Sequence, residues 1–387
     1  MRHGLYSILA IILLTLSCKD LGQMVVPPIN LDPRTYKFKV DMMQSPEGAS
    51  VNIQAIWGTA HNNMYAVGWH GIAYTYMFFH FDGNGWTDIT EPLRTPILDF
   101  GGGASFELLG IHGFAVNDFW IVGRWKQASF GSEGIKGEGF ALRYDGSKFI
   151  NMTPPGMPPA AEIGTRFYTI WGTSSNDIWV AGAYGYILHW NGGQWTNHRM
   201  TDTTASINDI LGRINNKLYA FSAVSSPAFG FALHEYDGAN WREIWYTDFG
   251  SGWFVNPVII NDTIYAAGNY GQVVRFNPDA TGPDRYEEIG LWGVEERSWE
   301  FSRYGFRGIL GNSFEDFVIY GGQDAGSQYN AVAGHYNGND VMPYPSTFVD
   351  GIVYVQGFRF ENSFFLIGKY EKGGPSNINI IVSAIPQ

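Results

Sequence analysis

The side chains best suited to recognition chemistry are five rings that share one position in a repeated phrase. The phrase reads Ile-Trp-Gly or a close variant, and a second glycine follows ten residues later, as with Gly172 and Gly182. Two residues after this second glycine, five copies carry His70, Trp125, Tyr184, Tyr270 and Tyr370. Such rings can stack on flat apolar ligand faces while neighbouring polar groups supply hydrogen bonds. We therefore expect a ligand-binding platform. The alternative is that each ring only covers its own tight turn.

A second set of candidate residues lies in the connections that lead into the repeats. It consists of Glu107, Arg166, Asn208, Asn256, Arg303 and Arg307. Arginine side chains can hold a carboxylate through paired hydrogen bonds, and with a glutamate and tyrosines they could support sugar chemistry. We expect Arg166, Arg303 and Arg307 to contribute to ligand binding. The plainer interpretation is a set of surface salt links.

Other chemistry has little support in the sequence. There is no His-Glu-x-x-His, cysteine pair or calcium-loop carboxylate spacing, so we predict no metal and no cofactor. The residues of the Asp-Gly and Asn-Gly turns recur in repeat after repeat, and His80, His189, His234 and His335 are predicted to share one repeat position. Because a catalytic pair is needed only once, we expect these repeated groups to be structural and assign no catalytic residue.

The repeats predict the elements that must position the candidate residues. Self-similarity at roughly 40–50 residues is typical of an array or propeller. Each repeat is divided by turn residues into four short strands, and Asp-Gly or Asn-Gly, a strong hairpin signal, precedes the outermost one. In a propeller, the turn between the second and third strands opens on the same face as the connection between blades. The rings and the arginines should therefore meet at one end of a central channel.

The number of repeats predicts how the ring closes. Seven units can be counted, and the last is one strand short, whereas residues 36–42 form an extra strand-like run before the first unit. Pairing residues 36–42 beside residues 378–384 completes the ring and removes an exposed sheet edge. We therefore predict an all-β chain with a single propeller of seven four-stranded blades, occupying residues 36–387 and closed by the N-terminal strand.

The first residues indicate export. Arg2 and His3 precede an apolar run that is too short to span a bilayer stably, which is typical of a signal peptide. The run ends in Leu14-Thr15-Leu16-Ser17-Cys18, which resembles a bacterial lipobox. That resemblance implies cleavage before Cys18 and lipidation of this cysteine. Residues 1–18 are thus predicted to be a lipoprotein signal peptide and residues 19–35 a tether. The alternative is an ordinary secretory signal with an incidental cysteine.

Composition limits the partners. The net charge is −12 and there is no Lys/Arg run, whereas nucleic-acid binding needs a basic footprint. We therefore predict no nucleic-acid partner and favour a neutral or cationic ligand. Cys18 is the only cysteine, so the mature domain has no disulfide, and its stability must come from a core supplied by 45% hydrophobic residues.

The repeated phrase, with its Asp/Asn-Gly-x-x-Trp turn, resembles the repeats of bacterial exported propellers and of the group holding sialidase-type and photosystem-assembly-factor-like propellers. Asp82 and Gly83 are adjacent, unlike their counterparts in a true Asp-box, so no sialidase residue is carried over. We expect a non-catalytic, monomeric lipoprotein, anchored at the bacterial outer membrane or cell surface, that binds a glycan, peptide or protein. The alternative is a glycoside hydrolase or polysaccharide lyase acting at the propeller mouth.

Overall fold

The computed structural model is described here for seventeen segments of the chain. They are residues 36–43, 51–70, 75–93, 104–127, 136–154, 166–200, 205–224, 230–248, 255–268, 272–280, 285–290, 304–324, 329–339, 341–344, 352–360, 363–370 and 379–386. Cys18, Tyr270 and Arg303 lie outside these residues, as do the predicted signal peptide and tether. Tyr370 is described by its backbone only.

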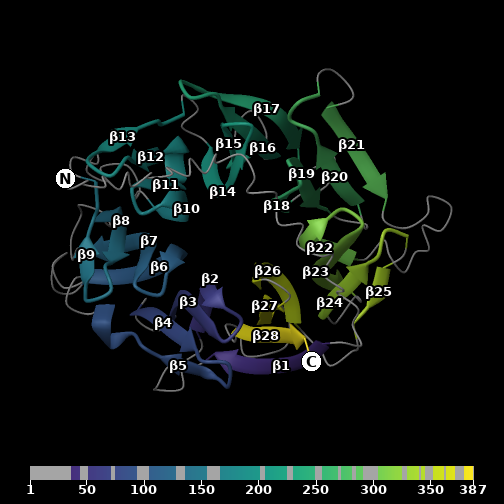
Figure 1. Ribbon diagram of the computed structural model, residues 1–387, viewed down its shortest axis with the longest axis horizontal. Coiled ribbons are helices and arrows are strands. Elements are labelled where there is room, and N and C mark those ends of the chain that lie inside the picture. The colour runs from purple at the N-terminus through teal and green to yellow at the C-terminus, as the bar shows by residue number, and fades with distance from the viewer. Residues whose placement is uncertain are drawn as a thin grey trace, which may run out of the picture.

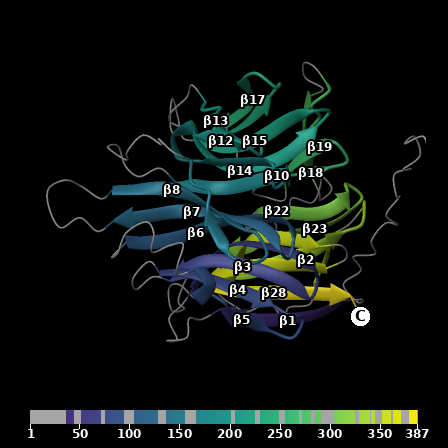
Figure 2. The same cartoon turned by 60° about the vertical axis from the view of Figure 1, so that its left-hand side comes forward.

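Seven four-stranded antiparallel sheets stand around a central opening, as Figure 1 shows. In six of the sheets the strand nearest the centre comes first in the chain, and the later strands follow outward. The sheets face one another like the blades of a propeller (Figure 2). The predicted fold class, a seven-bladed β-propeller, is confirmed.

The first three blades account for residues up to 197. Blade one holds β2 (Val51–Ala60), β3 (Asn63–His70), β4 (Thr75–Phe81) and β5 (Trp86–Asp88), followed by the short 3-10 turn η2 (Glu91–Leu93). Blade two holds β6 (Ala104–Ala115), β7 (Asp118–Gln127), β8 (Lys136–Tyr144) and β9 (Phe149–Asn151). Blade three holds β10 (Phe167–Ser174), β11 (Asp177–Gly182), the 3-10 turn η3 (Ala183–Gly185), β12 (Ile187–Trp190) and β13 (Trp195–Asn197).

The remaining blades follow the same order until the last. Blade four holds β14 (Ser206–Ile214), β15 (Lys217–Val224), β16 (Gly230–Tyr236) and β17 (Trp241–Asp248). Blade five holds β18 (Val255–Ile260), β19 (Thr263–Ala267), β20 (Gln272–Phe276) and β21 (Tyr286–Gly290). Blade six holds β22 (Tyr304–Ser313), β23 (Asp316–Asp324), β24 (Tyr329–Tyr336) and β25 (Val341–Pro343). Blade seven holds β26 (Ile352–Phe360), β27 (Ser363–Tyr370), β28 (Asn379–Pro386) and β1 (Tyr36–Met43).

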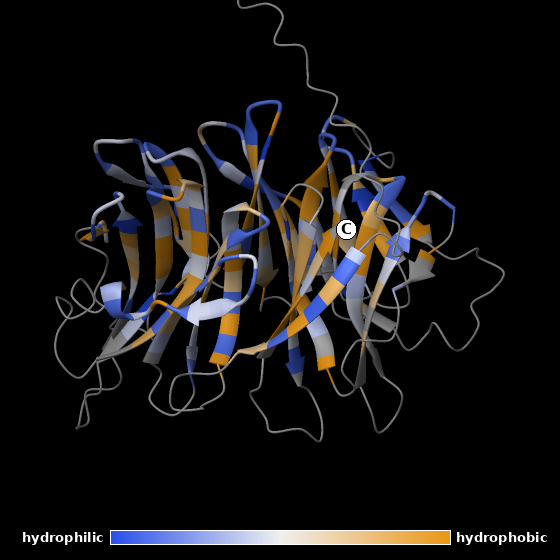
Figure 3. Cartoon of the chain, turned by 60° about the horizontal axis from the view of Figure 1, so that its bottom comes forward, coloured by the Kyte–Doolittle hydropathy of each residue, from blue (hydrophilic) through white to orange (hydrophobic). Residues whose placement is uncertain are grey.

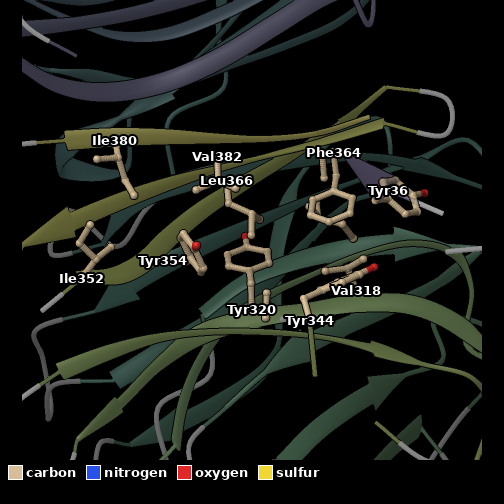
Figure 4. Packing of buried hydrophobic residues seen from close by; sticks show 13 residues of the cluster. Tyr36, Val318, Tyr320, Tyr344, Ile352, Tyr354, Phe364, Leu366, Ile380 and Val382 are labelled. Atoms are coloured by element: carbon tan, nitrogen blue, oxygen red, sulfur yellow. The ribbon is translucent and has the colours of Figure 1, made fainter. Parts of the chain in front are cut away.

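Blade seven takes its outermost strand from the other end of the chain, as predicted. Strand β1 runs antiparallel to β28 over its full length, from Tyr36 opposite Pro386 to Met43 opposite Asn379. In Figure 1 the purple β1 lies directly beside the yellow β28. Tyr36 also contributes its ring to the apolar cluster between blades six and seven, where it lies 5.4 Å from the ring of Phe364 (Figure 4). The closing strand is therefore part of the core as well as of the sheet.

The core is divided into clusters that lie between neighbouring blades. Each of the seven blade interfaces has its own buried apolar residues, for example Trp179, Ile207 and Ala220 between blades three and four. Along a strand, alternate side chains reach the two adjacent interfaces, which requires both faces of every sheet to be apolar. Figure 3 shows this as orange bands on the strands, with blue polar residues at many turns.

The framing glycines allow the innermost and second strands to approach closely. A Cβ on Gly182 would stand 1.6 Å from the carbonyl oxygen of Arg166, and one on Gly123 would stand 1.9 Å from that of Glu107. No side chain fits at such a distance, so the backbone contact requires glycine. The repeated phrase is thus explained by the geometry of the strand pair.

Candidate functional site

The innermost strand of each blade carries a β-bulge near the end where that strand begins. We call this end of the channel the connection end, since the links between blades enter there. At each bulge one or two residues are skipped in the pairing with the second strand, as with Gln54 between Ile53 and Ala55. The skipped residues are Gln54, Leu109, Tyr168, Asn208, Asn256 (with Pro257), Arg307 and Val355, one position for each blade. Bulges commonly redirect a side chain beside a functional site.

These seven residues, which we call the bulge ring, surround a central channel of about 900 Å³. All of them except Arg307 are among the described residues that line it. A volume of this size lies at the upper end of the range for small-molecule pockets. The innermost strands share the repeated Ile-Trp-Gly-like phrase, but the bulge ring varies from blade to blade and contains amides, aliphatic groups, a tyrosine and an arginine. Its chemistry therefore differs from one side of the channel to the other.

Aromatic side chains also line the channel walls. Trp57 and Trp171 come from the repeated phrases of blades one and three, Tyr168 from the bulge ring, and Phe231 and Phe358 from blades four and seven. Trp57 stacks on Tyr65 with ring centroids 6.0 Å apart, and that contact holds it against its own blade. The walls combine apolar ring surface with separated amide groups, a pattern typical of sites that bind small molecules or peptide side chains.

Blade four contributes three polar residues to the channel: Ser206, Asn208 and Asp209. The hydroxyl of Thr169, on blade three, donates a hydrogen bond to Asp209 Oδ1 at 3.1 Å. Protein surrounds the carboxyl on most sides, and this burial raises the pKa of Asp209 from 3.8 to about 6, although hydrogen bonds from Thr169 and the Ile210 amide oppose the shift. Among the described residues that line the channel, Asp209 is the one carboxylate.

The opposite side of the channel is held by Asn256. Its side-chain amide donates to the carbonyl oxygens of Arg307, at 2.6 Å, and Val355, at 2.9 Å. These bonds join blade five to blades six and seven. The side chain of Asn256 is also hydrogen-bonded to the hydroxyl of Tyr320, whose pKa is raised by burial. Asn256 thus ties together a part of the ring formed by three different blades.

The structure brings together only part of the predicted cluster of arginines with a glutamate. Glu107 accepts a hydrogen bond from Arg124 on the neighbouring strand, and both side chains are buried, at 6% and 4% exposure. Burial lowers the pKa of Arg124, and the nearby charge of Arg166 lowers it further. Arg166 therefore lies near this pair at the connection end, whereas Arg307 belongs to the bulge ring on the far side of the channel.

The register places the backbones of the predicted rings at the connection end. His70 is opposite Val51, Trp125 is opposite Phe106, and Tyr370 is opposite Ile352, each near the first residue of an innermost strand. Tyr184 occupies the turn η3, with a φ of 59°.

The described side chains among them, those of His70, Trp125 and Tyr184, are not part of the channel lining. Trp125 packs partly against the apolar cluster between blades one and two. The position that does line the channel is the bulge ring. In five blades it stands two residues before the isoleucine of the repeated phrase, as Tyr168 does before Ile170, and its variation between copies was the available sequence signal.

The repeated polar groups at the opposite end form hydrogen bonds within their own blades. His189 lies 2.7 Å from Asp177, His335 lies 2.7 Å from Asp316, and His80 lies 2.7 Å from Asn63. In the tight turns, Asp82 Oδ1 accepts from the amides of Asn84 and Gly85, and the equivalent residues do the same.

His234 does not share this position, contrary to our expectation. It is one residue earlier in its blade and contacts Ser222 at 2.8 Å, while Glu235 occupies the equivalent site. An extra residue before the turn causes the offset, because His234-Glu235-Tyr236-Asp237-Gly238 corresponds to a four-residue phrase in blade one, His80-Phe81-Asp82-Gly83. The repeated polar groups have a structural role.

Two further observations concern the described residues only. They contain no group of three or more His, Cys, Asp or Glu side chains arranged to hold a metal ion. Nor do they contain a helix with the length and apolar character needed to cross a membrane.

No protein-family model matches the chain, and no curated protein matches it. Among solved structures, it is similar to YCF48 bound to D1 peptide, with 14% identity, a TM-score of 0.59, and 95% of this chain and 100% of that chain covered. BamB from Moraxella catarrhalis aligns at 12% identity, with a TM-score of 0.45 and coverage of 90% and 97%. A Dyadobacter fermentans protein of unknown function aligns at 10%, with a TM-score of 0.43 and coverage of 91% and 99%. At this identity, the likeness to YCF48 shows a shared fold.

Proposed function

We propose that this protein is a non-catalytic β-propeller of the cell envelope that binds a peptide segment of a partner protein in its central channel. The observation that carries the proposal is the channel of about 900 Å³, lined by a bulge ring whose side chains differ from blade to blade. A chemically varied surface can distinguish one partner from another, which a uniformly repeated surface cannot do. The similar fold of YCF48, solved with a D1 peptide, supports a peptide as the ligand.

The rim at the connection end extends the proposed site. A peptide that leaves the channel there would pass the backbones of His70, Trp125 and Tyr184, and Arg166 lies near Arg124 at the same end. We propose that these residues, with Tyr270, Tyr370, Arg303 and Arg307, contact the partner outside the channel. Tyr184→Asn combined with Tyr270→Ala should then weaken binding with little change in melting temperature, because asparagine tolerates the positive φ at residue 184.

The proposal also includes the location. The sequence of residues 1–18 supports export and acylation of Cys18, which would hold the propeller at the membrane surface. A lipid anchor and the tether of residues 19–35 would leave the propeller free to reach a partner at the envelope. Binding of a glycan or hydrolysis of one is the competing function. Glycoside hydrolysis normally uses two carboxylates, whereas the described channel lining offers one, Asp209.

A display selection tests the proposal. The full-length protein is panned against a random peptide library and, in parallel, titrated with a panel of oligosaccharides. Enriched peptides are then measured against Leu109→Trp, which narrows the channel, and against Val116→Trp, which places the same ring on an exposed residue of the same blade. We expect a loss of at least tenfold in affinity for Leu109→Trp and no change for Val116→Trp. Equal binding by both variants, or binding of oligosaccharides alone, would overturn the proposal.

A further inference from the structure

Asp209 is a carboxylate in the channel wall that has no cationic partner in the described part of the chain. Its hydrogen bonds come from the Thr169 hydroxyl and the Ile210 amide, and no Lys, Arg or His of the described residues lies within ion-pair distance. The buried glutamates among the described residues are paired, since Glu107 bonds Arg124 and Glu235 bonds Arg242. Burying an ionised carboxylate without a counter-ion is energetically unfavourable. A bound cationic ligand would supply the missing counter-ion.

The surroundings of Asp209 supply further acceptors. Asn208, the adjacent member of the bulge ring, is exposed to the channel. Ser206 lies two residues earlier in strand β14 and also lines the channel. Within the described part of the chain, neither side chain forms a hydrogen bond. An ammonium or guanidinium group carries several N–H donors, and one carboxylate, one amide oxygen and one hydroxyl match that set. The walls of Trp171 and Phe231 can cover the aliphatic part of a long side chain.

We propose that the channel holds the cationic side chain of a lysine or arginine from the partner peptide, with Asp209 as its counter-ion and Asn208 and Ser206 as additional acceptors. This inference rests on the proposed function and specifies its ligand. The net charge of −12 favours the approach of a cationic segment. Inside the channel the attraction between the two charges is screened less than in water, so it contributes more to binding than a surface pair does.

The other titratable groups that face the channel leave this assignment intact. His112 Nε2 donates a hydrogen bond to the Gly172 carbonyl oxygen at 3.1 Å, and burial lowers the pKa of His112, which favours its neutral form. Tyr168 and Lys369 line the same channel from blades three and seven, and neither forms an ion pair with Asp209. Tyr320, behind Asn256, experiences the Asp209 charge, and burial keeps its hydroxyl protonated.

Four capped pentapeptides, Ala-Ala-X-Ala-Ala with X as Lys, Arg, Gln or Glu, test the inference by calorimetric and NMR titration of the full-length protein. At pH 7.5 we expect the Lys and Arg peptides to bind at least tenfold more tightly than the Gln peptide, and the Glu peptide to bind least. Affinity for the cationic peptides should fall as the pH drops through about 6, because Asp209 becomes protonated. Asp209→Asn should reduce binding of the Lys peptide to the level of the Gln peptide.

Three further variants make this result specific. Asp262→Asn removes the same charge from an exposed turn at the opposite end of blade five, where asparagine suits the φ of 57°. It should leave binding unchanged. Thr169→Val keeps the Asp209 charge but removes a hydrogen bond that lowers its pKa, so the pH midpoint of binding should move upward, whereas Thr169→Ser should preserve it.

The outcomes separate the inference from the proposed function. Equal affinity for the Lys and Gln peptides, or an equal loss in Asp262→Asn and Asp209→Asn, overturns the cation site and leaves the peptide channel standing. The same holds if none of the four peptides binds but peptides from the display selection do. If neither set binds in the channel, both proposals fail.

Discussion

The side-chain amide of Asn256 donates a hydrogen bond to the carbonyl oxygen of Val355, 2.9 Å away and 99 residues later in the sequence. With the second bond to Arg307, it joins three blades beside the channel. The backbone of Asn256 has a φ of 46°, a conformation that asparagine and glycine adopt more readily than other residues. Both the side chain and the backbone of this position therefore call for asparagine.

Asn256→Gly should lower the free energy of unfolding by about 1.5–4.5 kcal/mol, because it removes three hydrogen bonds, to Arg307, Val355 and Tyr320, of about 0.5–1.5 kcal/mol each while keeping the backbone conformation. Urea denaturation measures this. Asn261→Gly is the matched control, since Asn261 has a φ of 48° in an exposed turn and should cost only a few tenths of a kcal/mol. Similar losses in the two variants would show that the contacts across the blades contribute nothing.

Gly182→Ala should prevent stable folding or cost more than about 3 kcal/mol. The new Cβ would stand 1.6 Å from the carbonyl oxygen of Arg166, so strands β10 and β11 would have to separate where they enter the channel. Gly193→Ala, where the nearest atom lies 3.7 Å away, should be tolerated. Thermal melts followed by circular dichroism compare the two. A melting temperature for Gly182→Ala close to that of the wild type would contradict our explanation of the framing glycines.

The fold was predictable because its signals are local and repeated. The spacing from Gly172 to Gly182, the turn at Asn191-Gly192 and the surplus strand at Tyr36 each specify backbone geometry that the structure contains. The site was harder to predict from the sequence, because a β-bulge changes the direction of a side chain and the repeat pattern does not reveal where the bulges lie. The strand pairing skips Tyr168, which lines the channel. The five predicted ring positions, by contrast, are represented at the rim by the backbones of those that the structure describes.

Contacts between distant blades were beyond the reach of the repeat pattern. The pairing of Asn256 with Val355 leaves no trace in either local sequence, and the same is true of the contact from Thr169 to Asp209. The prediction for His234 was wrong for a local reason. The phrase in blade four contains one more residue before its Asp-Gly turn, so Glu235 occupies the repeated position. A repeat alignment anchored on the Asp-Gly turn would have revealed it.

Ring closure can be tested by replacing residues 36–43 with eight Gly and Ser residues in the full-length chain. We expect a lower melting temperature and loss of a single cooperative transition, because the edge of β28 loses its partner and Tyr36 leaves the cluster with Phe364. A synthetic peptide with the sequence Tyr36–Met43 should raise the melting temperature again, whereas a scrambled peptide should not. An unchanged melting temperature of the replacement variant would show that β1 is dispensable.

Cys18→Ser tests the predicted lipid anchor. In a bacterial host, the wild-type protein should incorporate a radiolabelled fatty acid and fractionate with membranes. The variant should incorporate none and appear in the soluble envelope fraction, because one thiol carries the attachment and Cys18 is the only cysteine. Ser17→Ala, which leaves the cysteine in place, is the control. If Cys18→Ser still fractionates with membranes, residues 1–18 do not act as a lipoprotein signal.

Glu235 provides a prediction with a defined pH dependence. Its side chain is fully buried and accepts hydrogen bonds from Arg242 and Tyr219, both at 2.9 Å, and from Lys217 at 3.3 Å. Burial acts to raise its pKa, but these donors outweigh it and hold the pKa below the usual 4.5. The ionised form is therefore favoured in the folded state, and its contribution to stability is present above about pH 4.5 and is lost as the pH falls through the lowered pKa.

Glu235→Gln should consequently lower the free energy of unfolding by about 2–4 kcal/mol at pH 7, because it leaves a buried amide beside Arg242, Lys217, the Tyr219 hydroxyl and Arg285, whose guanidinium lies 3.6 Å from the Glu235 carboxylate. The difference from the wild type should shrink as the pH is lowered from about 5 to 3, since the wild-type carboxyl also loses its charge there. Guanidinium denaturation across this range measures both effects. Glu287→Gln removes an exposed partner of Arg275 and should cost less than about 1 kcal/mol. A pH-independent difference for Glu235→Gln would mean that the loss comes from packing and that the carboxylate charge does not stabilise blade four.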